Sequence, residues 1–549
     1  MRILRAAGIV AAITGCALLS GCSRAQTMAG GTSTSENGRV SGYVVDSAGK
    51  PEKDAVVEMV PAAYNPVKDS GASGPMTDTT DQQGRYSFDS VATGIYNIQA
   101  LGLSDGKRML GTGLPVAGDS FGDRIDTMRI PGSAQVMLPD DFNPAQGYVY
   151  VLGTTIAVPA GRAVEGRITI DSLPAGPLPA MYYDERKGDK RPSRLNYGVR
   201  VSSEGLVKAG YCAWSNVKRL YFNTTASGAD VAGNVRGFPA LVILTKSNFD
   251  FARASGDGGD LRFAKGDNTP LPYQIEKWDS ANARAAVWVR IDTVYGNTGD
   301  HYVRMHWGNP FAKDSSTGPA VFDTADGYQA VWHMQRGGSA AVLDATINHF
   351  DATAMGAVLP FDTTGAIGLA QRFAGAAGYL TVPNSAAGPL NFPEDGQYTL
   401  SAWVMTETLD KDYHFIVSKG NEQYGLQINK SNYWEFFEFQ NNLGWDSTIS
   451  PATLKTWTHI TGVRAGKKQY LYINGRCMDS TVKNASGIMP RVTTHDVCIG
   501  KRPMGANDTI SLFNGLIDEV YIANRAYSSD RIKLSYCNQQ ENSIFIIFK

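Results

Sequence analysis

Short apolar runs alternate with polar residues and are interrupted by turn residues along most of this chain. The first clear example begins near Arg39, where "GRVSGYVVDSAGKPEKDAVVEMV" contains two alternating segments around an Asp-Ser-Ala-Gly turn. Period-two alternation is typical of strands with one face in a core, and 59 glycines among 549 residues suit many tight turns. The sequence therefore predicts an all-β protein built of several small β-sandwich modules, roughly three or four domains at ~150 residues each.

The charge composition excludes one class of partner. The 51 basic and 52 acidic residues leave a net charge of −1, so no basic field is available to hold nucleic acid. Hydrophobic residues make up 43% of the chain and charged residues 19%, as in soluble globular proteins. After the N-terminal segment, no apolar run approaches the ~20 residues that span a bilayer.

The N-terminal segment has the features of an export signal. Arg2 and Arg5 precede the apolar stretch "AAGIVAAITGCALL", and the run "LSGC" ends at Cys22. This ending resembles the bacterial lipobox, in which the cysteine is diacylated and the chain is cleaved just before it. The resemblance implies a signal peptide over residues 1–22 and a lipid on Cys22 that anchors the protein in a membrane. The alternative is an ordinary secretory signal with a chance cysteine.

Residues 23–38 continue as a stretch rich in Gly, Ser and Thr without apolar periodicity, which predicts a flexible tether. Ser23, in place of an acidic residue, favours the outer membrane if the source is Gram-negative. We therefore expect a protein of the cell envelope that is lipid-anchored in the outer membrane and exposed at the surface.

Four cysteines remain after the signal and the lipobox: Cys212, Cys477, Cys498 and Cys537. An even number in an exported chain permits disulfides, and three pairings are open. Cys477 and Cys498 each lie in a predicted strand of one domain, which makes them the candidate disulfide. No two cysteines are close in the sequence and none has a histidine at ligand spacing, so a zinc site has no support.

Residues 39–107 combine turn positions with aromatic residues that alternate onto one face: Gly42, Gly49, Pro51, Gly84, Tyr86, Phe88, Gly94 and Tyr96. This segment resembles the carboxypeptidase-regulatory-like, or transthyretin-like, β-sandwich. The resemblance implies a spacer or a docking surface without peptidase chemistry. Residues 108–217 also alternate and predict another small β module of unclear type.

Residues 218–324 contain the segments "FPALVIL", "GGDLRFAKGDNTPLPYQIEKWD", "AAVWVRID" and "VRMHWGNP". They resemble an uncharacterised bacterial domain of unknown function that often precedes lectin-like modules in surface proteins. Asp260, Arg262 and Glu276 form either a polar site or an internal ion pair that braces a loop, and the ion pair is the commoner arrangement.

Residues 325–540 contain, in this order, "AVWHM", "RFAGAAGYLTVPNS", "YTLSAWVMTE", "WTHITGVR", "QYLYINGR" and "FNGLIDEVYIANRAYSSDRI". They resemble LamG-like jelly-roll domains of the concanavalin A-like lectin and glucanase superfamily, which implies a C-terminal two-sheet sandwich. Asn474 stands where the family frequently has Asp, which weakens any transfer of metal ligands. Residues 541–549 form a short apolar tail, for which we expect an edge strand or a truncated continuation.

The segment "NYWEFFEFQNN" of this domain combines aromatic rings with Glu435 and Glu438. Hydrolases of the superfamily carry their carboxylates two residues apart, so that an acid and a nucleophile flank one glycosidic bond ~5 Å apart. Side chains alternate across a strand, so glutamates three residues apart point to opposite faces unless a bulge intervenes. The spacing disfavours hydrolysis.

The same alternation divides the rings of this strand between its faces. We expect Phe437 and Phe439 to point into the core, which leaves Trp434 exposed on a concave sheet with Trp445 in the following loop. Indole rings stack on sugars, while amides and carboxylates bond the hydroxyl groups. The candidate ligand-binding residues are therefore Trp434, Glu438, Trp445, Asn432 and Asn441. The alternative is that both tryptophans pack against loops.

Calcium is a candidate cofactor, because concanavalin A-like domains often hold Ca²⁺ with carboxylate and carbonyl oxygens at a loop rim. Asp344 and Asp518 are the candidate metal ligands. Asp518 has an equally good structural use, in which it accepts hydrogen bonds from backbone amides at a strand end.

Together these features predict a lipid-anchored, non-catalytic surface protein that binds polysaccharide or glycoprotein through its LamG-like domain. Two alternatives stay open at this point. One is a structural or adhesive envelope protein that binds other proteins, and the other, least favoured, is a glycoside hydrolase.

Overall fold

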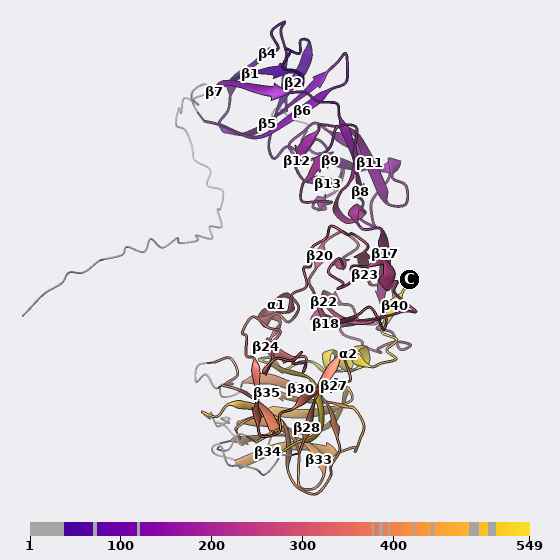
Figure 1. Cartoon of the computed structure of the whole chain (residues 1–549), viewed down its shortest axis with the longest axis vertical. Coiled ribbons are helices and arrows are strands. Elements are labelled where there is room, and N and C mark those ends of the chain that lie inside the picture. The colour runs from indigo at the N-terminus through magenta and orange to yellow at the C-terminus, as the bar shows by residue number, and fades with distance from the viewer. Residues whose placement is uncertain are drawn as a thin grey trace, which may run out of the picture.

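The computed structural model describes residues 38–69, 74–117, 121–375, 378–383, 388–392, 396–420, 423–440, 444–482, 494–502 and 512–549. Strands dominate these residues, with two α-helices among them, α1 (Gly318–Val321) and α2 (Ser529–Gln539). The sheets form four successive β units in an elongated molecule, with the first unit and the last at opposite ends (Figure 1). The prediction of an all-β fold is confirmed.

The first unit packs two sheets, of strand orders β4-β1-β7 and β3-β2-β5-β6, around a core that includes Val57, Phe88 and Ile98. It extends past the expected boundary at residue 107, because β6 pairs with β5 and β7 runs parallel to β1. The glycines of "RMLGTGLPV" hide the alternation of β6 in the sequence. Its strands are β1 (Gly38–Val45), β2 (Ala55–Pro61), β3 (Met76–Thr79), β4 (Arg85–Val91), β5 (Gly94–Gly102), β6 (Arg108–Val116) and β7 (Phe121–Thr127).

The second unit contains sheets of order β10-β9-β13-β14, β11-β8-β16 and β12-β15, and its core includes Val149, Ile170 and Met181. Strand β14 is the edge of its four-stranded sheet. Its strands are β8 (Gly132–Met137), β9 (Gly147–Val151), β10 (Ala157–Pro159), β11 (Arg167–Leu173), β12 (Gly176–Leu178), β13 (Met181–Glu185), β14 (Ser193–Arg194), β15 (Val199–Val201) and β16 (Leu206–Lys208).

The third unit has a five-stranded sheet of order β20-β19-β23-β17-β40 and a three-stranded sheet of order β18-β22-β21. Its last strand comes from the C-terminal tail: β40 pairs antiparallel with β17, and the chain ends beside this unit (Figure 1). The strands are β17 (Asn216–Phe222), β18 (Val235–Thr245), β19 (Arg262–Ala264), β20 (Pro270–Leu271), β21 (Tyr273–Asp279), β22 (Arg284–Val294), β23 (Tyr302–Trp307) and β40 (Ile546–Phe548).

The fourth unit is a sandwich of two eight-stranded sheets. One has the order β27-β28-β39-β30-β35-β36-β37, with β24 paired to β39, and the other has the order β25-β26-β29-β38-β31-β32-β33-β34. The strands are β24 (Tyr328–Trp332), β25 (Ala341–Val342), β26 (Ala352–Gly356), β27 (Phe361–Thr364), β28 (Leu369–Ala374), β29 (Gly378–Val382), β30 (Gln397–Thr406), β31 (His414–Lys419), β32 (Tyr424–Ile428), β33 (Tyr433–Gln440), β34 (Gly444–Pro451), β35 (Thr458–Ala465), β36 (Lys468–Ile473), β37 (Arg476–Val482), β38 (Val497–Ile499) and β39 (Asn514–Ala523).

The third and fourth units share a continuous apolar interface. Trp288 of the third unit packs with Phe322 and Tyr328, and Tyr527 and Ile532 belong to the same buried cluster. Arg531 of α2 is buried there and donates hydrogen bonds to the carbonyl oxygens of Arg236 and Gly237 at 2.7 and 2.9 Å. Helix α2 therefore connects the sandwich to the unit that precedes it in the chain.

The predicted disulfide between Cys477 and Cys498 is wrong. Cys477 lies on β37 in one sheet of the sandwich, whereas Cys498 lies on β38 in the other sheet. Both are free thiols, and the Sγ of Cys498 contacts Thr381 Oγ1 at 3.8 Å. The sequence places both cysteines in strands of one domain but does not show that these strands belong to different layers.

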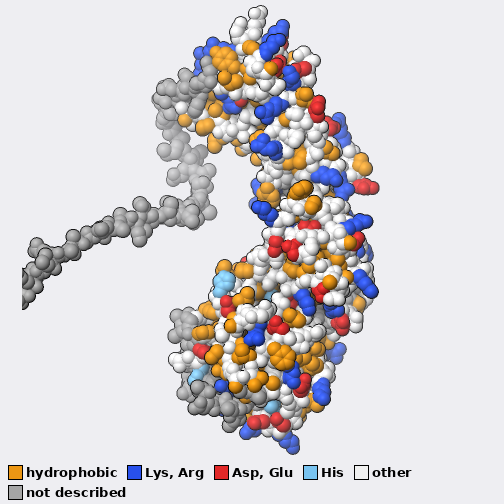
Figure 2. Space-filling model, viewed as in Figure 1, with side chains coloured by type: hydrophobic (Ala, Val, Ile, Leu, Met, Phe, Trp, Pro, Cys, Tyr) orange, Lys and Arg blue, Asp and Glu red, His pale blue; other side chains and the backbone are white. Residues whose placement is uncertain are grey.

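Positive and negative side chains are interspersed over the face shown in Figure 2, in agreement with the net charge of −1. Within the described ranges, no helix has the length and apolar character needed to cross a membrane. Cys22 and the tether over residues 23–37 lie outside the described residues.

Candidate functional site

Strand β33 divides its side chains between the sandwich core and the outer surface of its sheet. Trp434, Phe436 and Glu438 have no exposed surface, and the two rings belong to the cluster that fills the space between the sheets. Glu435 lines a pocket on the opposite face. The prediction that Glu435 and Glu438 point to opposite faces is therefore confirmed.

The face assigned to the core in the sequence is the wrong one. Trp434, predicted to be exposed, is buried, while Phe437 lies on the outer face beside Trp445, with ring centroids 5.9 Å apart. On each face of β33, a glycine of a neighbouring strand leaves space for a phenylalanine ring. Phe436 lies over Gly462 of the opposite sheet, and Phe437 lies over Gly425 of the adjacent strand β32.

Glu438 is a structural residue of the core. Its carboxylate pairs with the guanidinium of Arg464 and accepts a hydrogen bond of 2.7 Å from the hydroxyl of Tyr398. Burial, together with the Glu438 carboxylate, raises the pKa of Tyr398 well above its usual value. Glu438 is therefore not available to a ligand at the outer face, and its prediction as a ligand-binding residue is wrong.

The outer face of β31 to β34 carries a pocket of about 340 Å³. Phe415, Phe437 and Trp445 form a row of rings across three strands, with successive centroids 5.7 and 5.9 Å apart. Trp445 is 54% exposed, so its indole presents an open apolar surface. The described lining residues are Tyr413, Phe415, Gln427, Glu435, Phe437, Trp445, Ser447 and Arg502.

Polar groups stand beside this row of rings. Gln427 of β32 and Glu435 of β33 are direct cross-strand partners, and the Gln427 amide donates a 2.6 Å hydrogen bond to the Glu435 carboxylate. This bond fixes both side chains on the pocket floor. Among the described lining residues, Glu435 is the only carboxylate, whereas hydrolysis by two carboxyl groups requires a partner within ~5–9.5 Å.

The remaining predicted ligand residues fall in three places. Trp445 lines the pocket, but it lies on strand β34 and not in a loop. Asn432 lies in the turn before β33 with a φ of +61°, and its Oδ1 accepts a hydrogen bond from the Lys411 amide. Asn441 lies outside the described residues.

The other residues that line the pocket were not predicted from the sequence. Tyr413, Phe415 and Gln427 come from two earlier segments of the chain, "DYHFIVSK" and "YGLQIN". The alternation of these segments places Phe415 and Gln427 on outward positions, but only the pairing of β32 with β31 on one side and with β33 on the other brings them beside Glu435.

Both candidate calcium ligands are buried and hydrogen-bonded to the protein. Asp344 accepts hydrogen bonds from the amides of Val331, Thr346 and Phe350. Asp518 accepts from the amides of Ile367 and Glu519, which is the structural use that the sequence left open for it. Burial, reinforced by the neighbouring carboxylates, raises the pKa of Asp518 well above its usual value. Calcium binding stays a prediction.

A cluster of titratable groups is buried where the third unit meets the fourth. Glu276, His333 and Glu519 bring one potential ligand atom each to within 4.8 Å of one another. The Nδ1 of His333 lies 2.9 Å from Glu519 Oε1, and its Nε2 lies 3.2 Å from Gln274 Oε1. Because both ring nitrogens face oxygen acceptors, this geometry suits a doubly protonated imidazolium.

The pKa values follow from this environment. Burial would lower the pKa of His333, but Glu519 and then Glu276 outweigh it and raise the pKa to about 9. Burial, with the Glu519 carboxylate, raises the pKa of Glu276 to about 8. The cluster therefore holds protons at neutral pH in the interface between two units.

The polar site or ion pair expected from Asp260, Arg262 and Glu276 is not formed. Asp260 accepts hydrogen bonds from the backbone amides of Ser255 and Gly308, and Glu276 accepts from the indole of Trp288 at 2.7 Å. Arg262 donates to carbonyl oxygens instead of to a carboxylate. Asp260 and Arg262 each brace a stretch of backbone, and Glu276 holds the side chain of Trp288.

Two protein families match parts of the chain. A family described as the concanavalin A-like lectin/glucanases superfamily (Laminin_G_3) matches residues 374–533, within the fourth unit. A domain of unknown function, DUF2341, matches residues 257–335, which covers much of the third unit and the first strand of the fourth. These matches confirm the two domain resemblances noted for these segments. A search of the curated proteins found no match.

Solved structures that are similar to part of the chain include two toxin binding domains. The binding domain of paraclostridial mosquitocidal protein 1 has a TM-score of 0.32 and 18% identity, covering 38% of this chain and 52% of that one. The binding domain of botulinum neurotoxin serotype C1 has a TM-score of 0.32 and 16% identity, covering 40% and 53%. Domain 4 of AbnA, an extracellular arabinanase from Geobacillus stearothermophilus solved with arabinotriose, has a TM-score of 0.28 and 18% identity, covering 38% and 97%. The matched region spans about half the length of the toxin domains.

Proposed function

We propose that the LamG-like sandwich binds carbohydrate, without cleaving it, in the pocket on the outer face of β31 to β34. The observation that carries this proposal is the row of rings from Phe415 to Trp445 beside the Gln427–Glu435 pair. Flat rings offer apolar surface to the C–H face of a sugar. A fixed carboxylate accepts hydrogen bonds from the sugar hydroxyl groups, and a fixed amide can donate to them or accept from them. The family match to lectins and glucanases supports this ligand class.

The same geometry supports binding over hydrolysis. Glu435 faces the pocket and Glu438 is paired with Arg464 in the core, so the two carboxylates of this strand do not address one glycosidic bond. A lone carboxylate hydrogen-bonded to an amide suits recognition of vicinal hydroxyl groups.

The lipobox-like run that ends at Cys22 supports a location of this binding domain at the cell envelope. Acylation of Cys22 would anchor the chain, and in a Gram-negative source Ser23 favours the outer membrane. The first unit, whose sequence resembles the transthyretin-like sandwich, would then serve as a spacer between the lipid and the binding units. The ligand in this arrangement is a polysaccharide or glycoprotein outside the cell.

The test is a glycan array probed with the full-length chain and two matched variants. Trp445→Ala removes the exposed indole and should weaken binding to every positive glycan at least tenfold, equivalent to about 1.4 kcal/mol. Phe361→Ala removes another exposed ring, on β27 of the other sheet, and should leave binding unchanged. A flat array with the unmodified chain, or equal binding by both variants, would exclude this site.

A further inference from the structure

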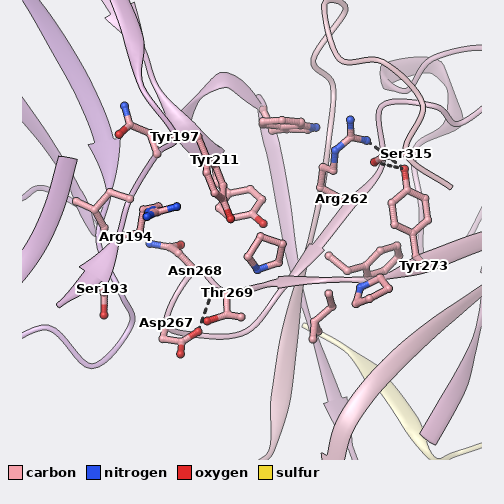
Figure 3. Close-up of a pocket in the computed structure, with 18 of the residues that line it drawn as sticks. Ser193, Arg194, Tyr197, Tyr211, Arg262, Asp267, Asn268, Thr269, Tyr273 and Ser315 are labelled. Atoms are coloured by element: carbon pink, nitrogen blue, oxygen red, sulfur yellow. Dashed lines mark hydrogen bonds between the residues drawn. The ribbon is translucent and has the colours of Figure 1, made fainter. Parts of the chain in front are cut away.

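A larger cavity lies between the second and third units. It is far along the chain from the pocket around Trp445 on the outer face of β31 to β34, which is called the LamG-like pocket below. Its volume is about 900 Å³. Arg194 and Ser193 of β14 line one side, while Arg262, Tyr273 and Ser315 line the other (Figure 3). The size is that of a site for a ligand of several rings, and neither family match nor sequence motif assigns it a role.

The cavity has a net positive lining. Arg191, Arg194 and Arg262 line it together with Asp267. None of the three arginines forms an ion pair with a carboxylate in the described part of the chain. Arg262 donates to the Tyr273 hydroxyl and to the carbonyl oxygens of residues 259, 261 and 313, so it contributes mainly charge, whereas Arg194 donates to the Tyr182 hydroxyl. Guanidinium groups without a carboxylate partner are suited to an anionic ligand.

Arg194 is held in place by two tyrosines. The guanidinium of Arg194 lies 5.1 Å from the ring centroid of Tyr197 and 5.5 Å from that of Tyr182, and its Nε donates to the Tyr182 hydroxyl at 3.0 Å. These contacts involve Nε and the flat faces of the guanidinium. They restrict the side chain before a ligand binds, so less conformational entropy is lost on binding.

Aromatic rings complete the lining. Tyr197 is 76% exposed at the rim, and Tyr211 is stacked on His306 with centroids 4.4 Å apart. Trp214 lies 5.9 Å from Tyr211 and under the guanidinium of Arg262. Rings fixed by packing, with one ring open at the entrance, suit stacking against the flat faces of sugars.

A peptide strand is less well accommodated. The cavity lies between two sheet edges, β14 and β20, where an extended peptide would need backbone partners. Pro270 and Pro272 lack an N–H, so residues 270–272 offer one donor, that of Leu271, and β14 is two residues long. Prolines on an edge block strand addition, but their rings add apolar surface for a saccharide.

We propose that this cavity is a second binding site, for a saccharide that carries carboxylate groups, such as a chain of uronic acids. Arg194 and Arg191 would pair with the carboxylates, and Tyr197 and Tyr211 would stack on the sugar rings. This site is separate from the LamG-like pocket and does not rest on the function proposed for it. It would give the chain a preference for acidic polysaccharides.

Isothermal titration of the full-length chain with tetragalacturonate tests the proposal, with the fully methyl-esterified tetramer as an uncharged probe of the same shape. The acid should bind saturably, the ester should bind at least tenfold more weakly, and added salt should weaken binding of the acid. Arg194→Gln and Tyr197→Ala should each weaken binding of the acid at least tenfold. Arg200→Gln removes an exposed arginine outside the cavity and should bind as the unmodified chain does. Tyr197→Phe keeps the ring and should bind within about threefold of the unmodified chain.

Four results with the ligands and the cavity variants would overturn the proposal, and a fifth comes from Trp445→Ala. They are no saturable binding of tetragalacturonate, equal affinity for acid and ester, equal affinity of Arg194→Gln and Arg200→Gln, and binding of tetraglutamate as tight as that of the sugar. Trp445→Ala provides the distinction from the LamG-like pocket. If it abolishes binding of the acid, the ligand occupies that pocket and the second site is rejected; if binding persists, the cavity is supported whatever the outcome of the glycan array.

Discussion

Glu438 illustrates how burial decides the role of a single residue. Its carboxylate pairs with Arg464, and both side chains are almost completely buried in the sandwich core. Tyr398 donates a hydrogen bond to the same carboxylate. A buried ion pair of this kind contributes little net stability because both charges lose their hydration, but removal of one partner leaves the other charge uncompensated.

Because the buried Asp446 carboxylate stays 3.7 Å from the Arg464 guanidinium, we expect Glu438→Gln to lower the free energy of unfolding of the sandwich by about 2–3 kcal/mol, below the cost of a fully uncompensated charge. The double variant Glu438→Gln/Asp446→Asn, which also removes the buried carboxylate 3.7 Å from the Arg464 guanidinium, should be markedly less stable than the single variant. Urea unfolding monitored by tryptophan fluorescence measures both. If the single variant is as stable as the unmodified chain, the pair is not the buried contact described above.

At the scale of elements, two buried histidines of the sandwich, one on a strand and one just after a strand, have opposite pKa shifts. His459 on β35 is buried with its Nε2 3.0 Å from the hydroxyl of Ser401, and burial lowers its pKa to about 3. His333, just after β24, has its pKa raised to about 9 by Glu519 and Glu276, which outweigh the effect of burial. Their ordinary pKa is about 6.5, so they titrate on opposite sides of neutrality.

Acid should destabilise the region around His459. Its folded-state pKa lies below the unfolded value, so its contribution is present above pH 6.5 and is lost as the pH falls toward 3; at pH 5 the loss is about 2 kcal/mol. Hydrogen exchange of residues 458–465 at pH 7 and pH 5, corrected for the intrinsic exchange rate at each pH, measures this loss of stability. His459→Gln should reduce the difference between the two pH values, whereas His349→Gln, at an exposed position, should preserve it.

Alkali should loosen the junction around His333. Its folded-state pKa lies above the unfolded value, so its contribution is present below pH 6.5 and is lost as the pH rises through 9; the raised pKa of Glu276 acts in the same direction between about 4.5 and 8. Hydrogen exchange of residues 328–334 should accelerate between pH 7 and pH 9.5 beyond the intrinsic rate. His333→Gln should reduce that excess, and no excess in the unmodified chain would contradict the assignment.

At the scale of the whole molecule, the C-terminal segment ties the sandwich to the unit before it. After α2, Phe545 enters the core of the third unit, where it stacks on Phe222 with ring centroids 5.4 Å apart. Strand β40 then adds to the edge of β17. The third unit is therefore completed by residues more than two hundred positions beyond its last other strand.

Deletion of residues 541–549 should destabilise the third unit although it leaves all strands of the sandwich in place. The loss of Phe545 alone should cost about 3–5 kcal/mol, as for a fully buried ring. Hydrogen exchange of residues 216–222 should accelerate in the truncated chain and in Phe545→Ala, and should change little in Ile547→Ala, whose side chain is 39% exposed. Unchanged exchange in the truncated chain would show that β40 does not support this sheet.

The sequence by itself determined the all-β class, the two family-like segments near the C-terminus and the opposite directions of Glu435 and Glu438, because strand alternation is a local property of the backbone. It did not determine which face of β33 is buried, since both faces carry aromatic rings. That choice depends on Gly462 in the opposite sheet, where the ring of Phe436 finds space. For the same reason the tertiary structure alone decided the separation of Cys477 from Cys498, the pocket around Trp445 and the return of the tail to β17: each joins residues that are distant in the chain, and local patterns do not specify such pairing.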